Sequence, residues 1–431
     1  MKRLTVIAAG LGWRTVERGL RTAGDSRPYQ ISGAKTGGSR PCRIAGLTAE
    51  AAPSVFPAVT CVAQASLRTG LSPAEHGMIS NGWWSETLRK PLFWEQSSAL
   101  VKGPRVWETK GDAALKGDAA LKGDATFLSR EKKIGLFFFQ QSLGENVDVL
   151  LSPAPIHKHG GGMIMSCYTK PTELAEELRR RCGTFPLWRY WGPLASPKVG
   201  RMCLKYFKEM TDLCDLDEAY LYLPTLDYAA QKRGPDSPAA RAAFAEFVRQ
   251  IESLADLCQQ RGCELTVTGD YEITPVTAAP VLPNVTLRKA GFFKTRTVGG
   301  RAYPDFYQST AFAMCDHEFC VVYGEVREKA VEALLATGGF ERSPSTQPLS
   351  HSATQPLSHL ATQPLSHIIL LAKQGSWCGY EWWTDRREAP DFASHVDIHN
   401  KPGYDPKELF FFNRGTVKGT HGRACEVAVL R

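Results

Sequence analysis

Short apolar runs alternate with stretches of helical periodicity along this chain, and this alternation most constrains the fold. Four runs have the length and composition of buried strands: 4–8, 133–139, 218–223 and 265–268. Residues 237–261 carry apolar side chains at close to a 3.6-residue spacing, with Pro238 in the first turn, which is typical of a helix. The alternation predicts an α/β fold with a mostly parallel sheet and helices on both faces. Ligand sites in such sheets lie at the carboxyl ends of the strands.

The length and hydrophobic content are those of a chain that buries one large core or two modest ones. It has 431 residues, of which 43% are hydrophobic. We expect a single domain over residues 1–431, with insertions at 21–51, 108–132 and 342–367. The last two contain near-perfect short repeats, and proline recurs in the last one, so it cannot form a continuous helix. These insertions are predicted to be disordered or weakly structured low-complexity loops.

The charge distribution and the cysteine content indicate which ligands and which cellular compartment suit this chain. The net charge of +8 is spread along the chain, so it favours phosphorylated substrates without the clustered footprint of a nucleic-acid binder. No apolar run approaches the ~18 residues needed to span a bilayer. The 12 cysteines include no Cys-x-x-Cys pair and are expected to be free thiols, which suits a reducing compartment. The sequence therefore predicts a cytoplasmic protein.

Thr60 occupies a position suited to a nucleophile. It follows a turn that contains Pro57 and precedes residues 62–69, which can form a helix. An alcohol at a helix N-terminus sits in a field that favours anions, as an attack on phosphorus requires. The structural alternative is that Thr60 only caps the helix, which is the commoner role of an isolated threonine there.

Residues 56–60 read Phe-Pro-Ala-Val-Thr and residues 69–77 read Thr-Gly-Leu-Ser-Pro-Ala-Glu-His-Gly, with Asn81 shortly after them. This segment resembles the type I phosphodiesterase and nucleotide pyrophosphatase family of the alkaline phosphatase superfamily. The family carries a Phe-Pro-x-x-Thr turn, a Thr-Gly-x-x-Pro-x-x-His-Gly loop and then an Asn, here Asn81. The resemblance implies an alkaline-phosphatase-like fold, a Thr60 nucleophile and donation from the Asn81 amide to a phosphoryl oxygen. His76 is expected to shape the loop. Trp83 and Trp84 follow closely, and a ring of either is expected to stack on a base or another flat group, unless both are core residues.

The resemblance also implies one or two divalent metal ions per chain, with zinc as the leading candidate. Asp227 stands at the Asp of the family's Pro-Asp-x-x-x-His-x-x-Gly-Pro motif, and Gln231 replaces its His one helical turn later. Asp270 matches the Asp of Asp-His-Gly-Met, where Tyr271 replaces the His. His399 is taken as the late imidazole ligand. The structural alternative for Asp227 is a helix cap.

One expected ligand is missing, because the first strand ends Ala8-Ala9-Gly10 without a carboxylate. The run 316–318, Asp-His-Glu, is a second-ranked source of ligands, since in a strand its carboxylates and its imidazole point to opposite sides.

Two functions follow from this pattern. The leading hypothesis is a metal-dependent enzyme that hydrolyses phosphodiester or nucleotide pyrophosphate bonds through Thr60. The alternative is a catalytically altered relative that binds a phosphorylated metabolite, or serves a biosynthetic assembly, without hydrolysis. The replacements at Gln231 and Tyr271 favour the alternative, and in either case the partner is a phosphorylated small molecule or nucleotide.

Overall fold

A computed structural model describes residues 1–21, 42–108, 132–159, 162–343, 367–397 and 400–431. Within them, nine strands form one large sheet in the order β10-β7-β6-β11-β1-β12-β21-β3-β2. Its strands are β1 (Arg3–Ala8), β2 (Arg43–Ile44), β3 (Leu47–Pro53), β6 (Ile134–Phe137), β7 (Val149–Pro153), β10 (Cys167–Lys170), β11 (Glu218–Leu223), β12 (Glu264–Gly269) and β21 (Glu426–Leu430). The four predicted strands are thereby confirmed as β1, β6, β11 and β12.

The centre of this sheet is parallel, and its carboxyl ends are level with one another. β1 pairs in parallel with β11 and β12, so that Ala8 lies opposite both Leu223 and Gly269. β6 and β7 continue the parallel order, whereas β10, β21 and β3 pair antiparallel with their neighbours. The predicted α/β architecture is confirmed, and the segments that follow β1, β11 and β12 begin at one edge.

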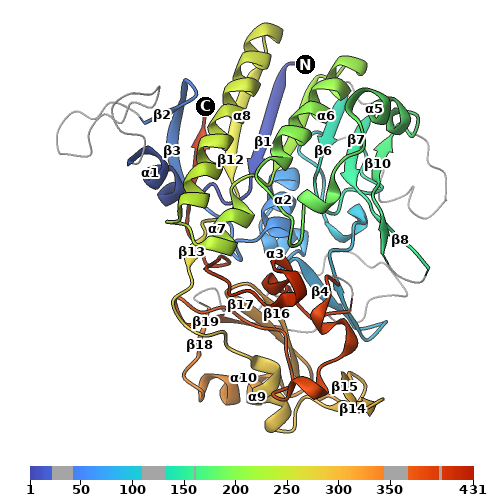
Figure 1. The fold of residues 1–431 in the computed structure, drawn as a ribbon, viewed down its shortest axis with the longest axis vertical. Coiled ribbons are helices and arrows are strands. Elements are labelled where there is room, and N and C mark those ends of the chain that lie inside the picture. The colour runs from blue at the N-terminus through green and yellow to red at the C-terminus, as the bar shows by residue number, and fades with distance from the viewer. Residues whose placement is uncertain (22–41, 109–131, 160–161, 344–366, 398–399) are drawn as a thin grey trace.

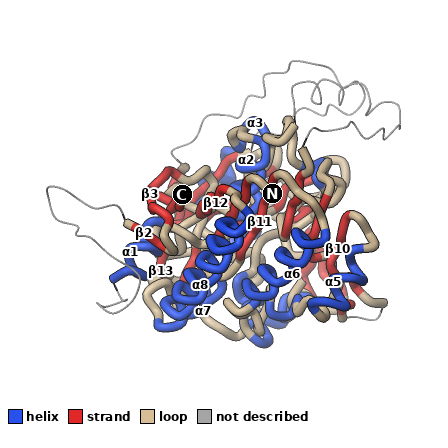
Figure 2. The backbone as a smooth tube through the Cα atoms, turned by 90° about the horizontal axis from the view of Figure 1, so that it is seen from above, coloured by secondary structure: helices blue, strands red, loops and turns tan. Residues whose placement is uncertain are grey.

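Helices cover both faces of the large sheet. Figure 2 shows α6, α7 and α8 on one side and α2 and α3 on the other. The helices are α1 (Trp13–Arg21), α2 (Thr60–Thr69), α3 (Pro73–His76), α5 (Leu174–Cys182), α6 (Val199–Leu213), α7 (Asp227–Arg233) and α8 (Pro238–Arg261). The predicted helix over 237–261 is confirmed as α8. The Ser237 hydroxyl caps it by accepting from the Ala240 amide, and Gly262 ends it at φ 64°, where a side chain would be strained.

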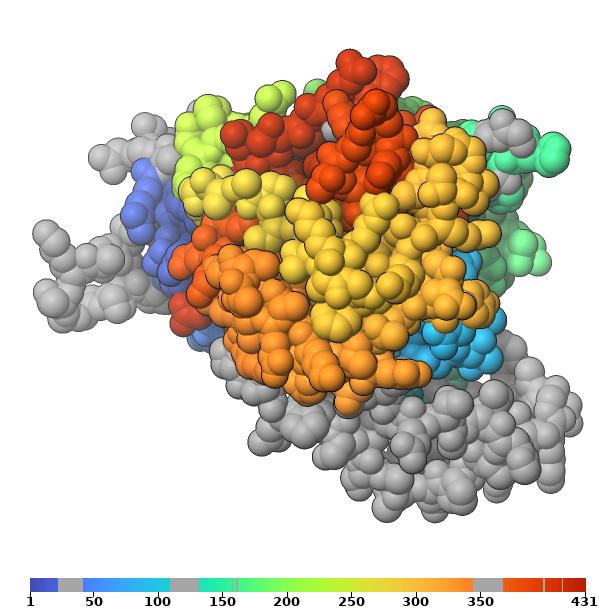
Figure 3. All heavy atoms as spheres, turned by 90° about the horizontal axis from the view of Figure 1, so that it is seen from below, coloured from blue at the N-terminus to red at the C-terminus, as the bar shows by residue number. Residues whose placement is uncertain are grey.

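A smaller antiparallel sheet lies below the carboxyl edge of the large one (Figure 1). Its order is β16-β17-β19-β18, and α9 (Pro283–Lys289) and α10 (Arg327–Leu335) pack against it. The strands are β16 (Phe312–Asp316), β17 (Phe319–Tyr323), β18 (Phe340–Arg342) and β19 (Ile368–Ala372). Figure 3, seen from below, shows this part (yellow and orange) forming the lower face, with the red segment before the C-terminus beside it.

Paired short strands and single turns of 3-10 helix complete the described elements. The strand pairs are β4 (Gly82–Ser85) with β5 (Lys90–Phe93), β8 (Ile156–His157) with β9 (Met163–Ile164), β13 (Thr274–Pro275) with β20 (Gly419–Thr420), and β14 (Thr295–Val298) with β15 (Arg301–Pro304). The 3-10 turns are η1 (Ser98–Leu100), η2 (Leu187–Arg189), η3 (Arg386–Glu388), η4 (Asp391–Ser394), η5 (Pro406–Leu409) and η6 (Phe411–Asn413).

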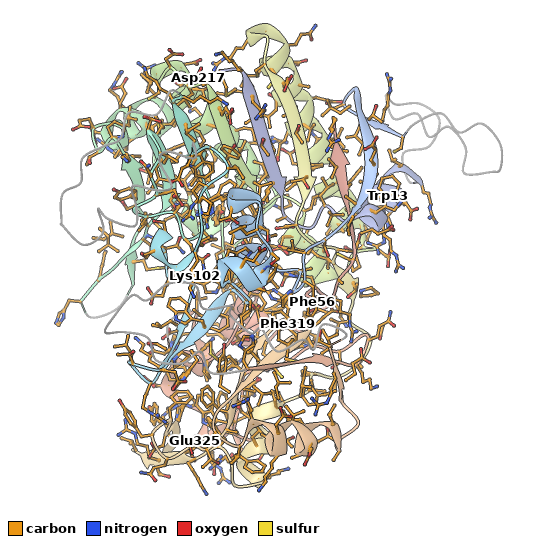
Figure 4. All side chains as sticks on the ribbon, turned by 180° about the vertical axis from the view of Figure 1, so that it is seen from behind. Trp13, Phe56, Lys102, Asp217, Phe319 and Glu325 are labelled. Atoms are coloured by element: carbon orange, nitrogen blue, oxygen red, sulfur yellow. The ribbon has the colours of Figure 1, made fainter. Side chains whose placement is uncertain are left out.

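The two sheets have separate hydrophobic cores that meet at the carboxyl edge. In the larger core Phe137 packs edge-on against Phe207, with ring centroids 5.0 Å apart. The smaller core surrounds Phe319 and Val321 of β17. Figure 4 shows the labelled Phe56 and Phe319 close together at this junction, between Asp217 at one end of the molecule and Glu325 at the other. Side chains of the Thr60 turn therefore face the small sheet.

The segments predicted as insertions lie largely outside the described residues. Residues 42–51 of the first segment belong to the large sheet, however, because β3 pairs with β21 and β2 pairs with β3. All 12 cysteines are free thiols, as predicted. Among the described residues, no helix combines the length and apolarity needed to cross a membrane.

His76 fixes the turn between α3 and β4, as expected for a residue that shapes the loop. Its Nδ1 accepts from the Met78 amide at 3.1 Å, so Nε2 carries the proton and donates to the Ser66 hydroxyl at 2.9 Å. The side chain is fully buried. Burial, with a smaller contribution from the charge of Arg68, lowers the pKa of His76 to about 4.

We predict that His76 causes part of the loss of stability in acid. Between about pH 6.5 and pH 4 the unfolded chain binds a proton at His76 that the native chain does not, so stability falls as the pH falls. In the His76→Gln variant, the slope of the unfolding free energy against pH should decrease by up to about 1.4 kcal/mol per pH unit in this window. Urea unfolding at several pH values measures both slopes, and equal slopes would contradict the assignment.

Candidate active site

Thr60 is the first residue of α2 and lies at the junction of the two sheets. Val59 is the N-cap residue, with φ −137° and ψ 160°, and its own side chain does not cap the helix. The alternative in which Thr60 is only the cap is therefore wrong. The Thr60 side chain is 7% exposed. A helix start presents backbone N–H groups and the positive end of the helix dipole, which favour a phosphoryl group.

Asn81 joins the start of α2 to the small sheet. Its Oδ1 accepts from the Cys61 amide at 3.0 Å, and its Nδ2 donates to Asp316 Oδ1 at 3.0 Å. The Asn81 backbone amide also donates to Asp316 Oδ2 at 2.7 Å. An amide nitrogen carries two protons, so the contact with Asp316 leaves one for the phosphoryl oxygen that the resemblance implies. In this structure Asn81 first holds the helix start in place.

The Asp-His-Glu run forms a hairpin turn that points into the site. β16 ends at Asp316 and β17 begins at Phe319, so His317 and Glu318 form the two-residue connection, and the expected strand alternation is wrong. His317 has φ 57°, a left-handed conformation that a residue with a side chain seldom adopts outside special sites. Asp316 Oδ1 and His317 Nδ1 are 2.7 Å apart. The turn thereby brings a carboxylate and an imidazole to the carboxyl edge of the large sheet.

Asp227 and Asp270 lie at the same edge, just past β11 and β12. Gln231 Nε2 donates to Asp227 Oδ1 at 2.7 Å, so these two side chains share one helix face, as their spacing predicts. Asp270 Oδ1 accepts from the amides of Gly10 at 3.0 Å and Tyr271 at 2.8 Å. Asp270 Oδ2 is buried, with no hydrogen-bond partner among the described residues.

Both carboxylates are held in a low-dielectric interior. Burial raises the pKa of Asp227 to about 6, opposed by hydrogen bonds from Gln231 and Tyr271 and by the charge of His317. Burial also raises the pKa of Asp270 well above its usual range, and the negative charge of Asp227 adds to this effect. The negative charge of Asp227 therefore lies close enough to oppose the ionisation of Asp270.

His421 is a site residue that the sequence reasoning missed. Its Nδ1 donates to the Ala58 carbonyl at 3.0 Å, two residues before Thr60, and its ring stacks on Tyr271 at 3.6 Å. Burial lowers its pKa well below the usual value, so the ring is neutral. His399, chosen for the late imidazole, lies outside the described residues. The His421-Gly422 dipeptide, just before the last strand, is the signal that could have directed the choice to His421.

Contacts link the Thr60 turn to both carboxylates. Ala58 contacts His421, His421 stacks on Tyr271, and Tyr271 follows Asp270 in sequence and hydrogen-bonds Asp227. Thr60, Asn81, Asp227, Gln231 and Asp270 thus gather at one edge.

The two tryptophans expected to face the substrate differ in environment. Trp84 is buried in the small-sheet core, with its ring 4.5 Å from Phe312 and 5.0 Å from Phe306. Trp83 alternates with it along β4 and is half-buried. Stacking of Trp83 on a flat ligand group stays a prediction, and Trp84 has the environment of its core alternative.

The donor set does not fit the pair of zinc ions that the resemblance implies. Zinc favours imidazole and thiolate ligands, but two of the expected imidazole positions hold Gln231 and Tyr271. Glu272, the next carboxylate along the chain, is bonded to Thr15 and Arg18 of α1 at 3.0 Å each. Among the described residues no group of three or more His, Cys, Asp or Glu side chains is arranged to hold a metal ion. The unpaired Asp270 Oδ2 alone does not make a cation site.

Trp191 and residues 401–408 pack against the Asp227 side of the site, and we call them the cover. The ring of Trp191 is 5.4 Å from that of Tyr228 and 5.6 Å from that of Tyr404, and its Nε1 donates to Glu408 at 3.3 Å. Buried Lys401 bonds both Glu408, at 2.6 Å, and Asp405, at 2.8 Å. This paired cluster fixes residues 401–408 and therefore the position of Tyr404.

We predict that Asp316 is the most costly single residue to remove from the site. Its two oxygens accept from Ser80, from Asn81 twice and from His317, all of them buried. Asp316→Ala should lower the unfolding free energy by about 2–5 kcal/mol, because these donors lose their acceptor. Chemical denaturation gives the value. Asp385→Ala, at an exposed ion pair with Arg387, is the control and should cost at most about 1 kcal/mol. Equal costs for both variants would refute the role of Asp316.

Comparisons with known proteins show the family and the fold of this chain. The sequence profile described as type I phosphodiesterase / nucleotide pyrophosphatase matches residues 44–405. No curated protein matches the chain in sequence. A phosphonoacetate hydrolase from Sinorhizobium meliloti 1021, in complex with phosphonoformate, has a similar fold, with a TM-score of 0.57 at 14% identity, covering 100% of this chain and 89% of that chain.

Murine ectonucleotide pyrophosphatase / phosphodiesterase 5 is a second protein of similar fold, with a TM-score of 0.51 at 12% identity, covering 100% of this chain and 88% of that chain. An inactive variant of the same mouse protein is known in complex with AMP, with the same TM-score of 0.51. At these identities the likeness concerns the fold, while the sequence profile spans most of the chain. The chain therefore belongs to the type I phosphodiesterase / nucleotide pyrophosphatase family, a family of phosphodiesterase- and pyrophosphatase-type hydrolases.

Proposed function

We propose that this chain binds a phosphorylated small molecule or nucleotide at the N-terminus of α2, with Thr60 against the phosphoryl group. The observation that carries the proposal is the start of α2 at Thr60, where Val59 offers no side-chain cap and Asn81 accepts from the Cys61 amide at the junction of the two sheets. Helix N-termini bind phosphate through backbone N–H groups and the helix dipole, without a metal. The structural neighbours that hold phosphonoformate and AMP support this ligand class.

The side chains at the expected metal-ligand positions favour binding, rather than cation-assisted hydrolysis, as the leading function. Gln231 and Tyr271 stand where the resemblance implies imidazoles, and Asp227 and Gln231 bond each other. Stabilising the charge that develops on phosphorus during transfer is the main task of such metal ions. This chain keeps the groups that hold a phosphoryl group but not the donors that hold two zinc ions.

A second candidate is hydrolysis of a phosphodiester or nucleotide pyrophosphate with Thr60 as nucleophile. Family membership favours it, together with the retained Thr60, Asn81, Asp227 and Asp270. In this candidate the Thr60 oxygen attacks phosphorus, the leaving group departs from the opposite side, and water later releases the phosphoryl group from Thr60. Of the two candidate functions, only this hydrolysis requires a divalent metal ion.

Thr60→Val is the variant that tests the proposal, because it keeps the side-chain shape and removes the hydroxyl. We predict that the wild-type chain binds AMP, measured by calorimetry, and that Thr60→Val weakens binding by about tenfold or more. A hydrogen bond to a charged group contributes about 1.5–3 kcal/mol. Thr286→Val, on α9 in the small-sheet part, is the control and should bind AMP as the wild type does. Equal AMP affinity in Thr60→Val, or no binding of AMP or inorganic phosphate by the wild type, would refute the proposal.

The same proteins distinguish the two candidates when they are assayed with a chromogenic phosphodiester and added zinc, manganese or magnesium. Binding without turnover supports the leading proposal. Turnover that is lost in Thr60→Val but kept in Thr286→Val establishes the second candidate in its place.

A further inference from the structure

Four aromatic rings form a continuous buried column through the candidate site. Their order is Tyr271, His421, His317 and Tyr404, with successive centroids 3.6, 3.7 and 3.7 Å apart. Tyr271 is parallel to His421 within 3°, and His317 to Tyr404 within 17°. Each ring is at most 3% exposed. The four residues come from separate segments, so the column joins the end of β12, the approach to β21, the β16–β17 turn and the cover.

The hydroxyl groups of the two tyrosines in the column form hydrogen bonds with Gln231 and Asp227, which stand at metal-ligand positions of the resemblance. The Tyr404 hydroxyl donates to Gln231 Oε1 at 2.6 Å, and Gln231 in turn donates to Asp227 at 2.7 Å. The side-chain amide of Gln231 therefore forms hydrogen bonds through both its oxygen and its nitrogen. Hydrogen bonding from Tyr271 also reaches Asp227. Gln231 Oε1 and Asp227 Oδ1, two oxygens that a cation on this side could use, already accept hydrogen bonds.

The two central rings of the column make contacts that fix the turn before Thr60. His421 Nδ1 donates to the Ala58 carbonyl at 3.0 Å, and His317 Nδ1 lies 2.7 Å from Asp316, which holds Asn81. Positioning of the turn is what a cation bridging Thr60 and the carboxylates would otherwise contribute. Stacked rings and directed hydrogen bonds perform it here.

We infer that the ring column takes the structural place of the cation pair, so that this chain folds and orders its phosphoryl site without a divalent metal. Gln231 and Tyr271 are the residues that convert the site, because the first joins Tyr404 to Asp227 and the second provides the end ring of the column. The inference concerns metal binding and stability, and it is tested without any phosphorylated ligand. Its outcome is therefore separate from that of the proposed function.

The test compares the full wild-type chain with a Gln231→His, Tyr271→His double variant. Each protein is stripped with a chelator, dialysed against zinc, manganese or magnesium, and analysed for bound metal and melting temperature. The wild type should hold no stoichiometric metal, and its melting temperature should not respond to metal or chelator. The double variant should bind about one zinc ion per chain, and its melting temperature should fall when chelator is added, because two imidazoles then join Asp227 and Asp270.

A Tyr168→His, Gln260→His double variant is the matched control, since it adds two histidines at exposed positions. It should resemble the wild type in metal content. One or more equivalents of tightly bound metal in the wild type, with a rise in melting temperature, would overturn the inference. Failure of the folded Gln231→His, Tyr271→His variant to bind more zinc than the control would also overturn it, because Gln231 and Tyr271 would then not be what converts the site. If that variant does not fold, the wild-type measurement alone decides.

Discussion

The buried carboxylate of Asp316 is the interaction on which the site depends. It accepts hydrogen bonds from Ser80, Asn81 and His317, and Asn81 in turn holds the Cys61 amide at the start of α2. A buried carboxylate is tolerated only when several donors compensate for its lost hydration. That requirement ties the helix that starts at Thr60 to a hairpin of the small sheet, more than two hundred residues further along the chain.

The rest of the site follows from the level carboxyl ends of β1, β11 and β12. Because these strands are parallel and in register, Gly10, Asp227 and Asp270 emerge at one edge, where the small sheet meets the large one. The edge is therefore a place where polar groups are buried between two hydrophobic cores. Buried polar groups are generally hydrogen-bonded, and here Asp316, Asn81 and Gln231 are bonded to other groups of the protein.

Family membership favours hydrolysis, whereas the side chains around Asp227 and Asp270 favour binding without hydrolysis. The sequence profile and the fold assign the chain to a family of hydrolases. The residues around Asp227 and Asp270 form a packed arrangement of rings and amides, in which Gln231 and Tyr271 stand where the resemblance implies imidazoles. The retained Thr60 favours one proposed function and the replacements at Gln231 and Tyr271 favour the other.

The sequence by itself determined the α/β fold class, the four central strands, the α8 helix, the Thr60 turn at a helix start and the placement of Asp227 and Asp270 after strands. These features depend on local periodicity, capping residues and turn chemistry, which a short window of sequence contains. It did not reveal the turn at His317, the role of His421 or the stacking of Tyr271 and Tyr404. Such contacts join residues that are far apart in the chain, and only the packing of the two sheets brings them within a few ångströms. Tertiary structure also decided that Asn81 and Gln231 are bonded within the protein, because the pairing of a buried polar group depends on every neighbour that surrounds it.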